Sequence, residues 1–172
     1  MANEQTTSGS DVQPRTVREL LERIAREREA LEQVVARISD EAFVATSGGW
    51  SAKDHLAHVS AWERRLLGEM QGDAAARLGL DEATHDAADT DTVNTYIQER
   101  YRDDSPDQVR AEFQASGDAL RTAIEAMSDV DLARPVRPED PIVDTLVDLI
   151  GWDTFKHYPQ HTPAILALLA DA

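Results

Sequence analysis

The feature of this sequence that most restricts its fold is a helical repeat of apolar residues that returns in four segments. In the first segment the apolar residues recur at helical spacing: Val17, Leu20, Leu21, Ile24, Leu31, Val34, Val35 and Ile38. This spacing lines one side of an α-helix of about six turns, which needs a partner surface to bury that side. We find no sustained two-residue alternation of the kind that predicts a strand, so the pattern predicts an all-α fold.

Three further segments repeat this pattern, over about residues 52–70, 106–128 and from 142 onward. Pro159 and Pro163 lie within the last of them. Each proline lacks the backbone N–H that a helix interior needs, so we expect a kink or a break there. Four long amphipathic segments suit a four-helix bundle.

The connections between these segments differ in composition. Residues 71–91 are small and acidic without a sustained period, so we expect a loop there that holds at most a short helix. A short helical piece follows over 93–101, and three prolines mark 133–141 as a linker. The chain length of 172 residues suits one domain, which we place at 15–172 after a flexible tail over 1–14.

Charge and cysteine content limit the partners and the chemistry. The chain has 33 acidic and 17 basic residues, a formal net charge of -16, and no cysteine. Nucleic acids and anionic membrane surfaces attract cationic faces, so this charge predicts neither as a partner. Without cysteine, a metal ion would have to be held by His, Asp, Glu or water.

No targeting or membrane segment is evident. The first residues, 1–14, are polar and small and lack the apolar stretch of a signal peptide. The longest purely apolar run, 164–170, has seven residues, whereas a membrane-spanning helix needs about 20. We therefore expect a soluble, cytoplasmic protein.

Three polar residues interrupt the apolar side of the last helical segment. At about 100° per residue, Asp153, His157 and His161 fall within about 60° of Leu146, where apolar residues are needed. A buried polar group costs free energy unless it is hydrogen bonded or ligated. Two histidines four residues apart on one helix can reach a single metal ion. The alternative interpretation is a set of hydrogen-bonded core histidines.

The second helical segment holds three more candidates. His55 lies about 50° from the centre of its apolar stripe and His58 about 110° away, so periodicity alone favours His55 as the inward residue. Glu63 falls inside the stripe. It is either a buried acid, base or orienting group, or a carboxylate at the end of the bundle.

The three tryptophans and His85 have a simpler interpretation. Large aromatic side chains are more often buried in a core or an interface than used as a substrate platform, and we expect this of Trp50, Trp62 and Trp152. His85 lies in the acidic loop and is expected on the surface.

Several motifs resemble those of the DinB superfamily, in particular its DinB-like or ClbS/DfsB branch. Gly49-Trp50-Ser51 followed by His58 resembles the second-helix signature, and FKHYPQH resembles the HxxxH motif of the fourth helix. The middle of the chain adds Asn94, the Ser105-Pro106 helix start and residues 128–132. The resemblance covers about residues 15–170 in order.

The resemblance implies a four-helix bundle with a long crossover connection, often a homodimer. It also implies a metal site of three histidines, one from the second helix and two from the fourth. On this match the ligands are His58, His157 and His161, so the resemblance selects His58 where periodicity favours His55. Asp153 stands where many members have Asn.

Known members imply a first hypothesis, a metal-dependent enzyme acting on small molecules. It would be a hydrolase, or a transferase using an external low-molecular-weight thiol, with a divalent Zn, Ni or Fe ion. Asp153 or Glu63 would then orient a histidine or act as general base. Two alternatives remain open: a non-catalytic stress or binding protein, and a ClbS-like hydrolase that works without metal through pocket acids.

Overall fold

The computed structural model describes residues 12–46, 49–136 and 142–170. The helices in these ranges are α1 (Val17–Val35), α2 (Asp40–Val44), α3 (Ala52–Gln71), α4 (Ala74–Leu78), α5 (Glu82–Ala87), α6 (Thr90–Arg100), α7 (Pro106–Glu125), α8 (Asp129–Leu132), α9 (Leu146–Asp153) and α10 (Tyr158–Ala170). The only extended pairing among the described residues is an isolated bridge between Pro135 and Thr145. The prediction of an all-α fold is confirmed.

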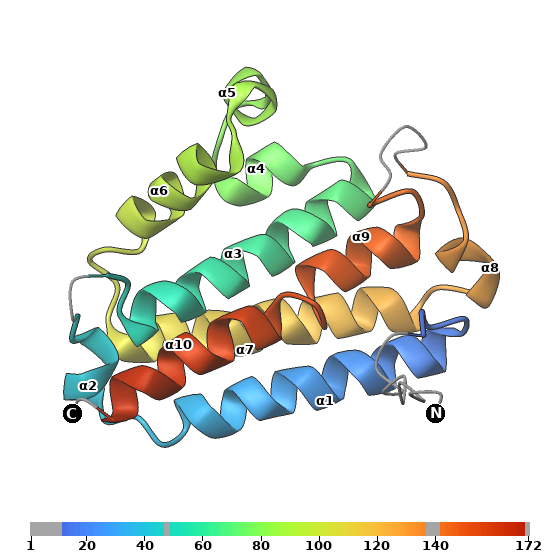
Figure 1. Ribbon diagram of the computed structural model, residues 1–172. Coiled ribbons are helices and arrows are strands. Elements are labelled where there is room, and N and C mark those ends of the chain that lie inside the picture. The colour runs from blue at the N-terminus through green and yellow to red at the C-terminus, as the bar shows by residue number, and fades with distance from the viewer. Residues whose placement is uncertain (1–11, 47–48, 137–141, 171–172) are drawn as a thin grey trace, which may run out of the picture.

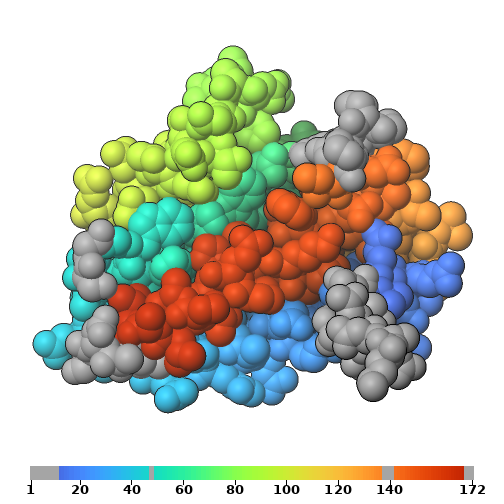
Figure 2. Space-filling model, in the orientation of Figure 1, coloured from blue at the N-terminus to red at the C-terminus, as the bar shows by residue number. Residues whose placement is uncertain are grey.

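The long helices form a four-helix bundle with a crossover (Figure 1). α3 runs in the same direction as α7 and packs against it, and α1 runs in the same direction as α10 and packs against that helix. Because α3 and α7 are successive long helices that run in the same direction, the chain has to cross back along the bundle between them. The short helices α4, α5 and α6 form this connection on the outside of α3. Figure 2 shows this crossover and the C-terminal segment on one face, with α3 between them.

Polar contacts fix where the two central helices begin. The hydroxyl groups of Ser51 and Ser105 accept the backbone N–H groups of Asp54 and Gln108, whose side chains accept in return, so each start is a capping box. The buried Lys53 Nζ donates to three carbonyls after α6, including that of Tyr101 at 3.1 Å. This ammonium ties the end of the crossover to the first turn of α3.

The last helical segment breaks in two, but the break precedes its prolines, and Pro163 lies inside α10. α9 ends at Asp153 and α10 begins at Tyr158. Thr154, with φ -129° and ψ -101°, leaves the helical conformation. Pro159 then falls in the first turn of α10, where backbone N–H groups have no partner within the helix. The break lies a few residues before the prolines and places His157 in the turn between the two helices.

α3 is the central helix, and more than one of its faces is buried. Its apolar residues Leu56, Val59 and Leu66 are fully buried, and so are the polar Ser60 and Glu63. Helices α4, α6, α7, α9 and α10 all pack against it. A helix covered from several sides has no single inward direction. This explains why the stripe-centre estimate for His55 and His58 misleads.

The segments around the bundle hold more structure than the sequence predicts. The acidic stretch 71–91 forms the two short helices α4 and α5. Residues 1–11 of the expected tail lie outside the described residues. Within 12–14, Pro14 is buried and Gln13 Nε2 donates to Asp148 Oδ1 at 2.6 Å. In the ranges that the structure describes, no helix combines the length and hydropathy that crossing a membrane requires.

Candidate metal centre

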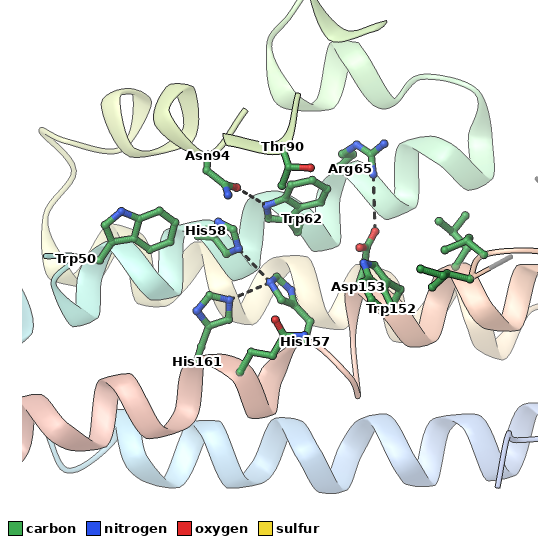
Figure 3. Close-up of a pocket in the computed structure, with 14 residues that line it drawn as sticks. Trp50, His58, Trp62, Arg65, Thr90, Asn94, Trp152, Asp153, His157 and His161 are labelled. Carbon is green, nitrogen blue, oxygen red and sulfur yellow. Dashed lines mark hydrogen bonds and ion pairs between the residues drawn. The ribbon is translucent and has the colours of Figure 1, made fainter. Parts of the chain in front are cut away.

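Three histidines from α3 and the C-terminal segment meet inside the bundle (Figure 3). His58 Nε2 lies 3.0 Å from His157 Nε2, and His161 Nε2 lies 2.9 Å from the same atom. One nitrogen of each ring falls within 4.8 Å of the others. His58 and His161 are buried and His157 is half-buried. The structure therefore brings together the three residues that the resemblance selects.

Hydrogen bonds satisfy this cluster poorly. His157 Nε2 faces two other ring nitrogens at 2.9–3.0 Å. A neutral imidazole nitrogen carries either one proton or one in-plane lone pair, so the two contacts have to share it in a weaker three-centre hydrogen bond. A cation bound among three lone pairs removes that conflict.

Burial keeps these rings in the neutral form. It lowers the pKa of His58 to about 2, with further lowering by the neighbouring imidazoles. Burial also lowers the pKa of His161 to about 3, with the other rings adding to the effect. For His157 burial lowers the pKa to about 4, against a smaller rise from the Asp153 backbone. Metal ions bind neutral imidazole, so at neutral pH all three rings are in the binding form.

The spacing also suits a shared ion. Two nitrogens bound to one tetrahedral ion at about 2.1 Å lie about 3.4 Å apart. The separations of 2.9 Å, 3.0 Å and at most 4.8 Å bracket that value. Three protein ligands leave a coordination position for water or substrate, which is typical of catalytic zinc sites.

His55 contacts the cluster through the ring of His161. Its Nδ1 lies 2.9 Å from Nδ1 of His161, the ring atom that does not face His157. If His161 uses Nε2 as a ligand, its Nδ1 carries the proton and donates to His55. Both histidines of α3 therefore lie at the cluster, His58 within the group of three and His55 beside His161.

A cavity of about 580 Å³ opens beside the cluster. Its lining includes the three histidines and all three tryptophans of the chain. The ring centroids of Trp50 and Trp62 lie 5.0 Å and 5.9 Å from that of His58. The expectation of core or interface positions thus missed their role as walls of a pocket. A pocket beside a ligand cluster is the general form of a small-molecule site.

Asp153 lies in the same cavity, paired with Arg65. Its Oδ2 is 3.9 Å from Arg65 Nη1, and its side chain is 6% exposed. Arg65 also donates to Glu69 at 2.7 Å and stacks over Trp62. His85, expected on the surface, covers this group from α5 with a side chain only 14% exposed. Sequence periodicity found Asp153 but offered no signal for Arg65.

Glu63 lies elsewhere. It does not line the cavity; its carboxylate, which is fully buried, accepts hydrogen bonds from Tyr158 Oη at 2.6 Å, from Ser116 Oγ and from Arg28. Burial raises its pKa, against the opposing effects of Arg28 and the hydroxyl donors. The structure thus separates the two proposed acid–base residues, placing Asp153 beside the histidines and Glu63 in the centre of the bundle.

Fold and site together define a class of protein. It is a four-helix bundle in which the second and the last long helical segments supply a cluster of histidines beside a pocket. The family model described as DinB superfamily matches residues 23–162. The chain belongs to the DinB superfamily, which confirms the resemblance of its motifs. No curated protein matches the chain significantly.

Solved structures share the fold at low sequence identity. A crystal structure from Escherichia coli UTI89, described as uncharacterised, has a TM-score of 0.71 and 18% identity over 92% of this chain and 95% of its own. A protein from Streptococcus pneumoniae has a TM-score of 0.72 and 15% identity over 87% and 88%. The colibactin self-resistance protein ClbS, in complex with double-stranded DNA, has a TM-score of 0.73 and 15% identity over 92% and 98%.

The ClbS complex corrects one expectation. The net charge of -16 led us to expect no nucleic-acid partner, yet a protein of this fold is crystallised with duplex DNA. Net charge sums over the whole surface, whereas phosphate binding depends on local cationic groups. The exclusion of nucleic acid from composition alone is therefore wrong.

Proposed function

We propose that this chain is a metal-dependent enzyme that acts on small molecules in stress or detoxification chemistry, as a thiol-dependent transferase or a hydrolase. The observation that carries the proposal is the contact of His157 Nε2 with two ring nitrogens beside a cavity. A divalent Zn, Ni or Fe ion bound there would supply Lewis acidity to a water or an external thiol. The thiol has to come from outside because the chain has no cysteine.

The other residues of the cavity have assignable tasks. Asp153, buried in the cavity lining with its Oδ2 3.9 Å from Arg65 Nη1, is the proposed proton acceptor. Trp62 Nε1 donates to Asn94 Oδ1 at 3.1 Å, which ties α6 to α3 beside the cavity. Glu63 keeps its predicted acid–base role only if proton transfer reaches the centre of the bundle.

Metal content tests the proposal directly. Protein purified without a nickel column should contain about one divalent ion per chain, because three neutral imidazoles converge on one point. His157→Ala should lower metal affinity by more than the roughly 100-fold that loss of an outer-shell partner costs. His85→Ala is the matched control, since it removes an imidazole outside the cluster and should leave metal content unchanged. Metal-free wild type that also fails to take up Co²⁺ would contradict the proposal.

His55 gives a second prediction. Its Nδ1 faces His161 Nδ1 at 2.9 Å, so His55→Ala should weaken metal affinity about 10–100-fold, the usual cost of losing an outer-shell hydrogen bond. His55→Gln should restore part of the affinity, because an amide oxygen can accept the same proton. Chelator competition measures both constants. Equal affinity in wild type and His55→Ala would show that His55 does not orient its neighbour.

A second candidate is a self-resistance role of the kind for which ClbS is named, with duplex DNA among the partners. The observation that favours it is the common fold over 92% of this chain. The buried pair of Asp153 and Arg65 would then act without a metal. Titration of a labelled DNA duplex at low and high salt tests the DNA partner, because phosphate contacts weaken as salt rises. Retention of activity in His157→Ala would favour this candidate over the first.

A further inference from the structure

Part of the cavity lining is apolar. It consists of Ile142, Val143, Leu149 and Trp152, here called the apolar wall. Val143 and Leu149 are buried, whereas Ile142 is 55% and Trp152 is 46% exposed. These are two of the most exposed large apolar side chains in the described residues. Both belong to one cavity wall, which distinguishes them from scattered surface hydrophobes.

Trp152 differs from the other two tryptophans of the cavity. Trp50 and Trp62 pack against imidazole rings at 5.0–6.5 Å between centroids. For Trp152, no ring stacking is found in the described part of the chain, and its closest recorded ring contact is Lys156 Nζ at 5.9 Å. Figure 3 places Trp152 beside Asp153, on the other side of His157 from Trp50. Its indole is thus available to a flat group that enters from the histidine side.

Charge in the cavity limits the other half of a ligand. Arg65 and Asp153 are the two charged residues among those that line the cavity, and their charges cancel. A divalent ion at the histidines would add positive charge, which an anionic group of the ligand offsets.

We propose that the cavity selects small molecules in which a flat apolar group is joined to an anionic metal-binding group, such as an aryl-bearing thiolate. The anionic group binds at His58, His157 and His161, and the flat group packs against Trp152 and Ile142. This inference rests on the proposed function for its anionic half only, since the apolar wall exists without an ion.

A pair of hydroxamates tests the proposal on Co²⁺-loaded protein. Acetohydroxamate and phenylpropionohydroxamate carry the same head group, and only the second can reach the wall. The phenyl compound should bind wild type about tenfold more tightly, and Trp152→Ala should remove most of that ratio. Trp152→Phe should keep the ratio, and Leu166→Ala, which removes an exposed apolar side chain outside the cavity lining, should leave it unchanged. An equal ratio in wild type and Trp152→Ala would overturn the proposal.

A metal-free arm separates this inference from the proposed function. Naphthol has no strong metal-binding group, and it should bind the chelator-treated wild type several-fold more tightly than Trp152→Ala. Naphthol binding that depends on Trp152, with no uptake of Co²⁺, supports the apolar wall and defeats the metal proposal. Hydroxamate binding that does not depend on Trp152 supports the metal proposal and contradicts the apolar wall. Circular dichroism verifies that the variants are folded.

Discussion

The metal-free protein should lose on the order of 5 kcal/mol of unfolding free energy between pH 6.5 and pH 5. Burial holds the pKa values of His58, His157 and His161 at about 2, 4 and 3 in the folded chain. In the unfolded chain each titrates near 6.5. Below that pH the unfolded state binds more protons, so stability falls as pH falls, by up to about 1.4 kcal/mol per pH unit for each ring.

Urea unfolding in the presence of a chelator, at several pH values, measures this loss. The window lies above the range in which most carboxylates titrate, so the histidine contribution stands apart from general acid denaturation. His161→Gln removes one of the three groups and should reduce the pH dependence by about one proton. Saturating Zn²⁺ should delay the loss, because the ion binds only the folded, unprotonated cluster. Constant stability down to pH 5 would show that the rings are not buried in the manner described.

The parts of the site that the sequence predicted share one property. Asp153, His157 and His161 interrupt an apolar stripe, and a polar residue at a core position is visible without a structure. The break before α10 did not move the two histidines apart, because both lie after Thr154, where the chain leaves the helical conformation. The long helices follow the same logic, since the capping boxes of α3 and α7 lie at the starts of those helices and Pro159 lies in the first turn of α10.

The parts that the sequence could not predict depend on which elements pack together. Periodicity on one helix assumes one buried side, and α3 is covered on several sides, so the angles of His55 and His58 misled. Arg65 is a charged residue on a helix, and nothing in its local pattern shows that Asp153 will face it. The three tryptophans were expected in the core because a cavity is lined by the same apolar residue types as a core, and sequence alone does not distinguish the two.

Glu63 provides the second large effect. Its carboxylate joins all four parts of the bundle through Arg28 of α1, Ser116 of α7 and Tyr158 of α10. Gly117 makes this possible, since a Cβ atom there would clash with the Arg28 guanidinium. Glu63→Ala should cost about 3–5 kcal/mol of unfolding free energy, because it leaves a guanidinium that is only 12% exposed without its buried charge partner, with the more exposed Glu32 as its remaining ion pair.

The double variant Arg28→Met with Glu63→Leu distinguishes two causes of lost stability: removal of the whole ion pair, and a buried charge left without its partner. It removes both charged groups together, so it should be closer to wild type in stability than Glu63→Ala, and urea unfolding of the full mutant cycle measures the coupling. The same variant tests the predicted acid–base role of Glu63. If the double variant folds, binds metal and keeps its activity, Glu63 only stabilises the bundle. If it folds and binds metal but loses activity, Glu63 takes part in proton transfer between the cavity and the centre of the bundle. A Glu63→Ala protein as stable as wild type would contradict the buried ion pair itself.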